Sequence, residues 1–356
     1  MTELLQEQVA NEIRRALGPA TRLAALTPLA GDASSRRYYR ARLENSPRAD
    51  SSIVMELAGS ALPLSSEELA IFKEPPTELP FINVHRFLST LGVRVPALFG
   101  IAPDQKLLLL EDLGDRALWD AVQALPSDEI FAWYQKAVDQ LLLIQVEGTR
   151  RRDDRCVAFQ QRFDFRLYQW EFEHFIEYGI EKRPGGKISD AEKSRLRESF
   201  EEIARRLAGL EPCLSHRDYH SWNLMALNGA VAVIDFQDAL LAPPQYDLAS
   251  LLNDRETDGI VDGNLETRLL DYYLNRREAL GPRADRAEFF DDYVLSALQR
   301  DFKVVGRFYY LDIVKGKPGY KKYIPPTLKR LKRNLERAPR YRKLIPLLRP
   351  HFEELR

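Results

Sequence analysis

Four side chains in two neighbouring segments have the types and the spacing that phosphoryl transfer from a magnesium nucleotide requires. His216, Asp218 and Asn223 lie close together in one segment, and Asp235 follows in the next apolar segment. In kinase-type transfer, carboxylate and amide oxygens hold the magnesium ions that neutralise the phosphates, while a separate carboxylate orients and deprotonates the accepting hydroxyl. We therefore expect Asp218 to be the catalytic base and Asn223 and Asp235 to bind Mg²⁺.

A β-hairpin would bring these residues together. The pattern predicts a strand end at 214–217, a tight loop at 218–222, a strand at 224–225, a turn at 228–229 and an apolar strand at 230–236. Such a hairpin returns Asn223 towards Asp235. His216 is expected to point inward and to hydrogen-bond the backbone around the metal loop, which is a structural role and not that of a proton carrier.

The pattern His-x-Asp-x-x-x-x-Asn followed by Ile-Asp-Phe resembles the aminoglycoside-phosphotransferase and choline-kinase branch of the protein-kinase-like fold, with Asp-Phe-Gln-Asp where Asp-Phe-Gly is usual. Further segments resemble the cell-wall-recycling sugar kinases that phosphorylate N-acetylmuramate and N-acetylglucosamine at the anomeric hydroxyl. These segments are 31–40, 108–114, 216–225, 235–239 and 246–247. In the last hundred residues only 299–306 is similar. The resemblance implies ATP and Mg²⁺ as cofactors, an amino-sugar acceptor, and Asp247 as the acid that pins the catalytic loop.

Length and element pattern indicate an α+β protein with two lobes, because 356 residues exceed the usual size of one compact domain. We expect a small antiparallel-sheet N-lobe at 1–112 and a larger, mostly helical C-lobe at 113–356, which carries the catalytic hairpin and the acceptor site. The N-lobe elements predicted are helices at 2–17 and 81–91 and strands at 22–29, 36–43, 52–58, 95–101 and 106–111. The C-lobe helices predicted are 127–146, 163–180, 189–207 with a capping box, and one opening at 243–251.

Two loops are expected to meet the nucleotide. The turn at 31–35 takes the place of the phosphate-covering glycine loop, and the backbone N–H groups of Ser34 and Ser35 could form an anion-binding concavity there, although an ordinary hairpin turn has the same composition. The segment 110–114 is expected to be the hinge between the lobes, where backbone groups of Glu111 and Leu113 would meet adenine.

The third strand lacks the lysine that normally contacts the α- and β-phosphates, since the first lysine of the chain is Lys73. An arginine can supply the counter-charge through a planar bidentate fork. The candidates are Arg36, Arg37 and Arg40; strand alternation places the first and third on one face and the second on the other, and leaves open which face meets the nucleotide. The missing lysine also keeps open a non-catalytic, nucleotide-binding regulator.

The acceptor site is less well defined by the sequence. His220, Trp222 and Asp238 could line it, or they could pack the loops and cap a turn. The aromatic residues of 163–180 form either a belt that stacks on a sugar or a helix packed on two sides. The acids of this segment, including Glu171, could bind acceptor hydroxyls. Aminoglycosides and choline-like acceptors stay open as alternatives.

Composition excludes several classes of protein. A formal charge of −1 argues against a nucleic-acid binder, and the basic segment 321–343, with ten Lys or Arg against one acid, lacks interleaved aromatics. This basic segment could be a solvated helix face, or it could attract an anionic acceptor. Cys156 and Cys213 indicate a reducing compartment without disulfides. No apolar run approaches a membrane span, and residues 1–15 do not resemble a signal peptide, so we expect a cytoplasmic monomer.

Overall fold

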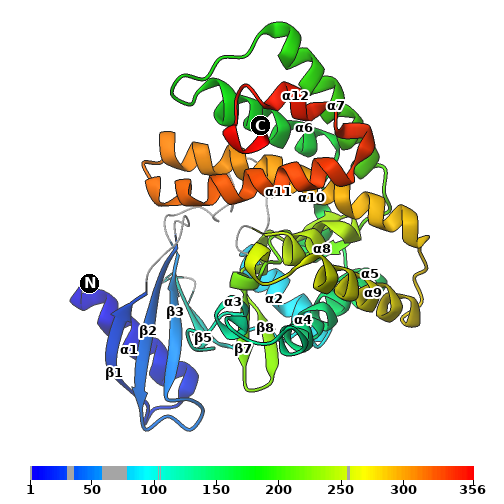
Figure 1. The fold of residues 1–356 in the computed structure, drawn as a ribbon. Coiled ribbons are helices and arrows are strands. Elements are labelled where there is room, and N and C mark those ends of the chain that lie inside the picture. Colours follow the sequence, from blue (N-terminus) through cyan, green and yellow to red (C-terminus); the bar gives the residue numbers. More distant parts are fainter. Residues whose placement is uncertain (1, 30–35, 58–77, 103, 105, 255–256) are drawn as a thin grey trace.

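The computed structural model contains an N-terminal antiparallel sheet and a larger, mostly helical remainder, and Figure 1 shows the two side by side. It describes residues 2–29, 36–57, 78–102, 104, 106–254 and 257–356. The two-lobed α+β prediction is confirmed. Ser34 and Ser35 lie outside the described residues, so the prediction for the phosphate-covering turn has no structural description.

The sheet has five strands in the order β1-β2-β3-β5-β4, and all neighbours are antiparallel. Their bounds are Arg22–Pro28 (β1), Arg37–Glu44 (β2), Ser51–Glu56 (β3), Leu98–Ala102 (β4) and Leu107–Glu111 (β5). The predicted strand at 95–101 therefore begins three residues later than expected. The backbone just before it still contacts β5, since the Ala97 carbonyl accepts from the Glu111 nitrogen at 2.8 Å.

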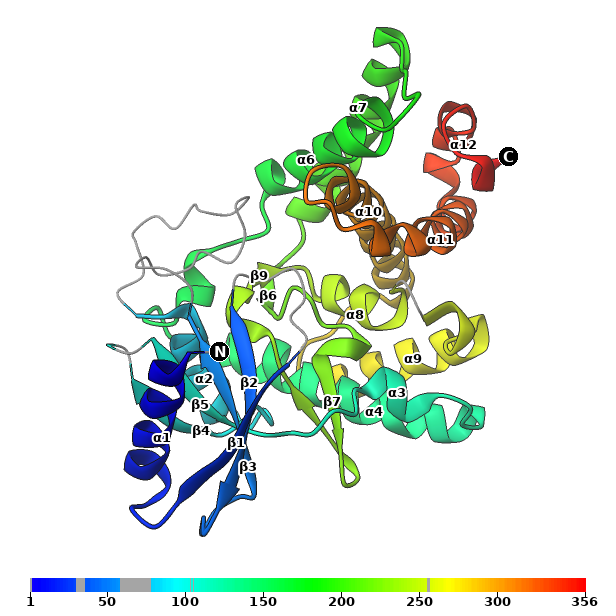
Figure 2. The same cartoon turned by 90° about the vertical axis from the view of Figure 1, so that its left-hand side faces the viewer.

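Helix α1 (Glu3–Leu17) covers one face of the sheet, as Figure 2 shows. It begins at Thr2, whose hydroxyl accepts from the Leu5 nitrogen at 3.4 Å, and ends at Gly18 with a φ of 113°. Its apolar stripe packs against alternate strand residues that include Tyr39. Leu4, on the same helix, is 65% exposed.

The other face of the sheet turns towards the helical remainder. Tyr38 and Met55, one residue away from the side chains under α1, join the main hydrophobic core. The face that α1 leaves uncovered is therefore the one that packs against the helical remainder. Helix α2 (Pro80–Thr90) joins the same core, and its Phe81 packs on Phe236 with 4.9 Å between ring centroids.

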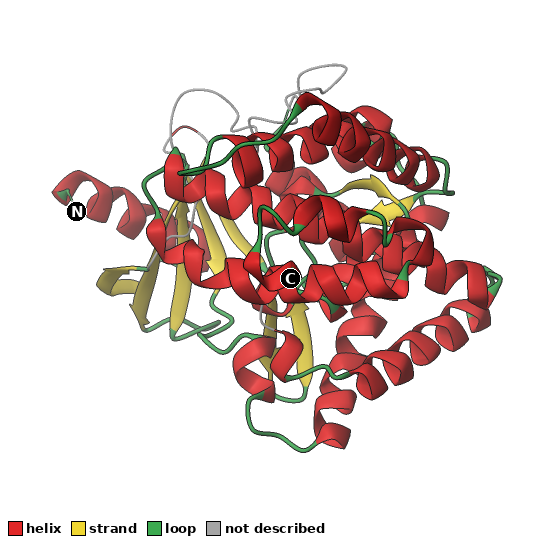
Figure 3. Cartoon of the chain, turned by 45° about the horizontal axis from the view of Figure 1, so that its top comes forward, coloured by secondary structure: helices red, strands yellow, loops and turns green. Residues whose placement is uncertain are grey.

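The helical remainder surrounds two small antiparallel pairs of strands, which are yellow among red helices in Figure 3. Its longer helices are α4 (Ser127–Leu142), α6 (Phe165–His174), α7 (Asp190–Ala208), α8 (Pro244–Leu252), α9 (Gly263–Ala279), α10 (Arg286–Ile313) and α11 (Ile324–Arg337). Its shorter helices are α3 (Leu118–Val122), α5 (Gly148–Arg150) and α12 (Leu344–Leu348). Within the described part of the chain every helix is too short or too polar to cross a membrane. Both cysteines are buried and free, as predicted.

The hairpin that the sequence predicts is confirmed. Strands β7 (Leu224–Leu227) and β8 (Ala230–Val233) pair antiparallel, and the turn between them uses Gly229 with a φ of 82°. Strands β6 (Cys213–Ser215) and β9 (Leu240–Ala242) pair beside it. The segment predicted to be the catalytic loop thus runs from β6 to β7, and the segment predicted to be the metal loop runs from β8 to β9; we keep these two names for them.

The predicted helix at 163–180 is interrupted. Helix α6 ends at His174, and a wider π-helical turn, η4 (Phe175–Glu181), follows. Helix α10 crosses at this point with very little clearance, because a Cβ atom on Gly306 would lie 2.8 Å from the Phe175 Cα atom. A periodicity of 3.6 residues cannot indicate such a widening, which depends on a helix more than 100 residues away.

The glycine at this crossing gives a prediction about stability. Gly306→Ala should lower the free energy of unfolding by about 1–2 kcal/mol, because the forced separation of the helices outweighs the better helix propensity of alanine. The matched control is Gly263→Ala, where the added Cβ meets open space and the free energy should be unchanged or slightly higher. Urea unfolding of both variants measures the difference, and equal values would contradict this account of the crossing.

Candidate active site

One buried acid holds the catalytic loop. Asp247, in the first turn of α8, accepts hydrogen bonds from the backbone nitrogens of His216 at 2.6 Å and Arg217 at 2.9 Å. The Nε2 atom of His216 lies 2.9 Å from the carbonyl oxygen of Ile234. Because His216 and Asp247 are both buried, these contacts tie the catalytic loop to the end of β8, where the metal loop begins.

Arg217 makes the sharp turn of this loop. Its φ of 80° is left-handed, a conformation that costs a non-glycine residue about 1–3 kcal/mol and persists only where the surroundings enforce it. Here Asp247 holds the Arg217 nitrogen, and Arg300 of α10 donates to its carbonyl oxygen at 3.2 Å. The turn therefore sets the direction of the next side chain, Asp218.

Asp218 lies among cations. Burial alone raises the pKa of its carboxyl group, but the charges of Lys303, Arg217 and Arg300 outweigh burial, and the pKa lies well below the usual range of an aspartate. Asp218 is therefore ionised at neutral pH and can accept the hydrogen of an approaching hydroxyl.

Lys303, in the middle of α10, is the leading cation in this set. Its Nζ atom lies 3.0 Å from the Tyr246 hydroxyl and 3.3 Å from Glu171 Oε1, and Gln299 donates to the other oxygen of Glu171. Burial lowers the pKa of Lys303, but Glu171, Tyr246 and Asp218 together outweigh this effect, so the pKa is raised and the ammonium stays charged. Glu171, a candidate for binding acceptor hydroxyls, is 2% exposed and engaged here instead.

Asn223 and Asp235 lie across the base of the hairpin from each other. The Ile234 nitrogen donates to the Asn223 carbonyl oxygen at 3.0 Å, which links the two loops. Asn223 donates through Nδ2 to the Asp218 carbonyl oxygen at 2.9 Å, so its Oδ1 atom is turned away from that bond. Asp235 has a left-handed φ of 62°, and its side chain is 46% exposed. Two residues with oxygen donors thus lie at the same end of the hairpin, Asn223 just before β7 and Asp235 just after β8.

This donor set fits Mg²⁺, which commonly takes one or two protein oxygens and completes its shell with phosphate oxygens and water. Among the described residues, no group of three or more His, Cys, Asp or Glu could hold a metal ion.

Asp238 lies beside the metal loop. Burial raises the pKa of its carboxyl group, and Asp235 and Asp218 reinforce the rise although Arg217 opposes it. The Nε2 atom of Gln237 bridges the two acids of this loop, at 2.9 Å from Asp235 and 3.1 Å from Asp238. The glutamine that replaces the usual glycine therefore orients both carboxylates.

The three candidate arginines have different surroundings. Arg36 is buried, and its Nη1 atom lies 4.0 Å from Asp235. Arg37 lies on the face that α1 covers, is 68% exposed, and pairs with Glu56 at 2.7 Å. Arg40 lies on the same face as Arg36 but is bound by two acids of the hinge. These acids are Asp112, at 2.7 Å, and Asp115, at 2.7 Å. Only Arg36 is brought to the metal loop.

The two predicted hinge residues, Glu111 and Leu113, have different surroundings. Glu111 pairs with Arg94 and accepts from the Ala97 nitrogen at 2.9 Å, so its carboxylate is engaged within the hinge region. Leu113 packs instead in a small apolar cluster. The other members of the cluster are Met225, Ala232, Leu227 and Ile234. An apolar surface from the hinge and from the hairpin strands thus lies next to Asp235.

His220 and Trp222 have local partners. The Nε2 atom of His220 lies 3.4 Å from the Nδ2 atom of Asn223, and the indole of Trp222 stacks on Trp119 of α3 with 4.5 Å between ring centroids. Trp222 thus fastens the catalytic loop to the helical remainder. His220 stands next to the side-chain amide of Asn223.

The sequence interpretation missed Lys303, Arg300 and Met225. The first two lie about 80 residues after the catalytic loop, and the only signal for them was the similarity of the segment 299–306 to the sugar kinases. Met225 could have been recognised as a possible nucleotide contact from its place on the strand after Asn223. Its apolar side chain packs with Ala232 of the paired strand and with Leu113.

The antiparallel sheet, the hinge and the paired catalytic and metal loops define a small-molecule kinase with a protein-kinase-like fold. Solved structures support the fold. One of them, a choline kinase from Streptococcus pneumoniae, aligns with a TM-score of 0.59 over 92% of this chain and 99% of its own, at 16% identity.

Residues 25–285 match the phosphotransferase enzyme family, and the chain belongs to this family. It transfers phosphate to a hydroxyl group. Two curated relatives are named N-acetylmuramate/N-acetylglucosamine kinase. The one from Pseudomonas putida is 28% identical over 98% of this chain and 94% of its own length. The one from Caulobacter vibrioides is 30% identical over 69% of this chain and 67% of its own length.

Proposed function

We propose that this protein transfers the γ-phosphate of ATP to the anomeric C1 hydroxyl of an amino sugar, N-acetylmuramate or N-acetylglucosamine. The observation that carries the proposal is the convergence of Asp218, Asn223 and Asp235 on one hairpin. The names of relatives that span most of the chain support the choice of acceptor.

ATP would bind between the sheet and the hairpin. The adenine would lie against Leu113, Met225 and Ile234, next to the backbone of the hinge, and we place the lobe boundary there, between 112 and 113. Asn223 and Asp235 would hold Mg²⁺, which when bound neutralises charge on the phosphate oxygens. The guanidinium of Arg36, on the same side as Asp235, would bind the phosphates in place of the missing lysine.

Asp218 would act on the acceptor. Its carboxylate accepts the hydrogen bond of the sugar hydroxyl and so directs the oxygen towards the γ-phosphorus. The new bond forms between this oxygen and phosphorus, the bond from phosphorus to the bridging oxygen of ADP breaks, and the hydroxyl proton passes to Asp218. Lys303, Arg300 and Arg217 keep Asp218 ionised for this task.

A panel of acceptors tests the proposal. ADP release should depend on added N-acetylmuramate or N-acetylglucosamine, and should be slower with glucosamine and absent with kanamycin. Turnover with kanamycin alone would point to an aminoglycoside kinase. Binding of magnesium-ATP without turnover on any acceptor would favour the non-catalytic regulator.

The assignment of Arg36 gives a second prediction. Arg36→Met should lower kcat/KM for ATP by about 10- to 100-fold, because a charge-assisted phosphate contact contributes about 1.5–3 kcal/mol. Arg37→Met is the matched control, since Arg37 is exposed on the covered face of the sheet, and its kcat/KM should stay within about two-fold. Equal losses in the two variants, at unchanged melting temperatures, would show that the phosphates are bound elsewhere.

A further inference from the structure

Lys303 can donate one more hydrogen bond than the protein uses. Among the described residues, two groups lie close enough to accept from its Nζ atom, the Tyr246 hydroxyl at 3.0 Å and Glu171 Oε1 at 3.3 Å. Glu171 is itself fixed, because Gln299 donates to its other carboxylate oxygen. An ammonium group carries three hydrogens. Two contacts therefore hold Lys303 in place, and its third hydrogen remains for a ligand.

Lys303 lies at the boundary between the buried network and the open site. Its two protein partners are buried, since Glu171 is 2% exposed and Tyr246 is 0% exposed. The Lys303 side chain keeps 19% of its surface exposed, and Asp218 is also partly exposed. Of the charges that lower the pKa of Asp218, that of Lys303 is the largest. The ammonium and the carboxylate therefore lie near each other where solvent can enter.

Helix α10 brings Lys303 beside Asp218 without pairing the two. Arg300 donates to the carbonyl oxygen of Arg217, the residue just before Asp218. Lys303 follows three residues later, on the same face of α10 and about 4.5 Å further along its axis. Among the described residues, its ammonium forms an ion pair with Glu171 and with no other acid. A group that binds at Asp218 therefore comes next to a cation that Asp218 itself does not occupy.

The charge balance of the transfer step favours a phosphate contact for Lys303. When Asp218 takes the hydroxyl proton, its negative charge disappears, and the cations around it lose a favourable interaction. Negative charge on the oxygens of the transferring phosphoryl group can replace this interaction, if one of the cations is within reach. Arg217 and Arg300 are buried in and behind the catalytic loop. Lys303 is the partly exposed cation of the three.

We propose that Lys303 is a catalytic residue, which donates its third hydrogen bond to an oxygen of the transferring γ-phosphoryl group. This inference rests on the proposed function, in which Asp218 receives the proton. In the step, the acceptor oxygen bonds to phosphorus, the bond from phosphorus to the bridging oxygen of ADP breaks, and the hydroxyl proton passes to Asp218. Lys303 keeps all three of its hydrogens throughout.

A mimic of the transition state separates this role from a structural one. In the full-length enzyme, Lys303→Met should lower kcat by about 10²- to 10³-fold, the loss typical when one positioned donor is removed. Aluminium fluoride bound with ADP and Mg²⁺ mimics the transferring phosphoryl group, and the variant should bind this complex about 10- to 100-fold more weakly. Binding of ADP with Mg²⁺ alone should stay within about two-fold, because ADP lacks the group that Lys303 contacts.

Two further variants control for stability and for charge. Lys303→Met leaves the buried Glu171 without its counter-charge, which destabilises the fold. The double variant Glu171→Gln/Lys303→Met removes both charges, so it should be more stable than the single variant but equally slow. Lys187→Met removes an exposed lysine just before α7 and should change neither kcat nor the binding of the aluminium fluoride complex.

Slow transfer with full affinity for the aluminium fluoride complex would overturn the inference, because Lys303 would then act only through the charge of Asp218. An unchanged kcat in the double variant would overturn it as well. The proposed function is tested separately. If the unmodified enzyme phosphorylates neither sugar, the choice of acceptor fails, whereas the titration with aluminium fluoride still decides whether Lys303 contacts the phosphoryl group.

Discussion

An Asp218→Asn variant should lose about 10²- to 10⁴-fold in kcat for sugar-dependent phosphate transfer, the range typical of a positioned general base. Asparagine has nearly the same shape as aspartate, but its amide cannot accept the proton and presents an N–H group to Lys303 and Arg300. The acceptor hydroxyl would lose its orientation as well as its base. Nucleotide binding should be largely retained, because Asn223, Asp235 and Arg36 are unchanged.

The measurement is steady-state ADP release together with a nucleotide titration. Asp128→Asn is the matched control, because the Asp128 side chain is 87% exposed on α4 and pairs only at the surface with Arg268. A variant at Asp218 with near-normal kcat would remove this residue from the reaction, whereas loss of both turnover and nucleotide binding would indicate a structural defect.

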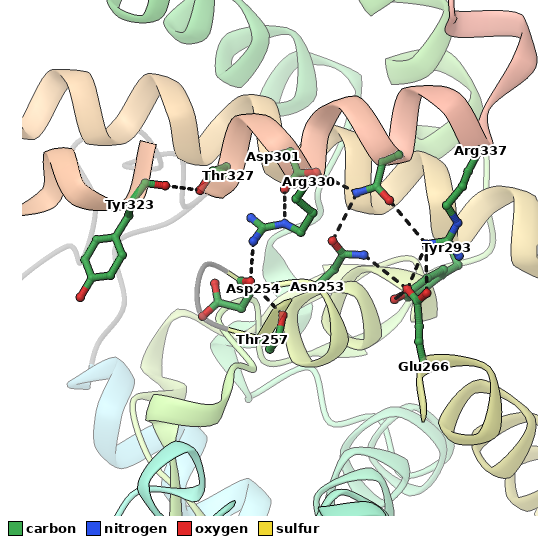
Figure 4. A network of polar contacts seen from close by, with 11 residues as sticks. Asn253, Asp254, Thr257, Glu266, Tyr293, Asp301, Tyr323, Thr327, Arg330 and Arg337 are labelled. Carbon is green, nitrogen blue, oxygen red and sulfur yellow. Dashed lines mark hydrogen bonds and ion pairs between the residues drawn. The ribbon is translucent and has the colours of Figure 1, made fainter. Parts of the chain in front are cut away.

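The second large effect concerns the C-terminal helix. Arg330 of α11 and Asp301 of α10 form an ion pair at 2.7 Å in which both side chains are 1% exposed, at the centre of the network in Figure 4. Asp301 also accepts from Asn334 at 2.8 Å, and Arg330 donates to the Asp254 carbonyl oxygen. Asp301→Leu should lower the free energy of unfolding by about 3–5 kcal/mol, because it leaves a buried guanidinium without its counter-charge.

Two further variants sharpen this prediction. Arg286, like Asp301, lies on α10, and Asp271 of α9 is its partner at the surface. Asp271→Ala should lower the free energy of unfolding by less than about 1 kcal/mol. The double variant Asp301→Leu/Arg330→Met should be more stable than Asp301→Leu alone, because the unpaired charge is gone. Urea unfolding measures all three variants. A double variant no more stable than the single one would show that the orphaned charge is not the cause of the loss.

This ion pair also bears on catalysis. Asp301 lies between Arg300 and Lys303, the two α10 cations that act on Asp218. The docking of α11 therefore holds the segment of α10 that faces the catalytic loop. The sequence favoured a solvated face for the basic residues of 321–343. Arg330 departs from this interpretation, because it is buried together with Leu328, Leu331 and Leu335 of the same helix.

What the sequence predicts well is local. The catalytic residues and the hairpin lie within about 25 consecutive residues, and a turn at Gly229 with alternating apolar strands is enough to place Asn223 beside Asp235. The sequence alone could not choose among Arg36, Arg37 and Arg40 as the phosphate-binding residue, because it does not show which face of the sheet is covered. Strand alternation separates Arg36 from Arg37, but only the docking of α1 on the Tyr39 side shows which face of the sheet turns to the helical remainder.

Contacts between distant segments could not be predicted from the sequence. Lys303 reaches Asp218 because α10 crosses behind the catalytic loop, and this crossing depends on Gly306 and on the buried pair of Asp301 and Arg330. None of these residues has a local pattern that indicates its partner, since buried ion pairs and close helix crossings are set by tertiary packing.

The most direct test of the central claim is the site of phosphate on the product. The enzyme would be incubated with ATP, Mg²⁺ and either N-acetylmuramate or N-acetylglucosamine, and the product examined by ³¹P nuclear magnetic resonance with proton coupling, beside the Asp218→Asn variant. We predict a sugar phosphate whose phosphorus couples to the single anomeric proton, and no product from the variant. Coupling to the two protons at C6, or phosphate on kanamycin alone, would contradict the account.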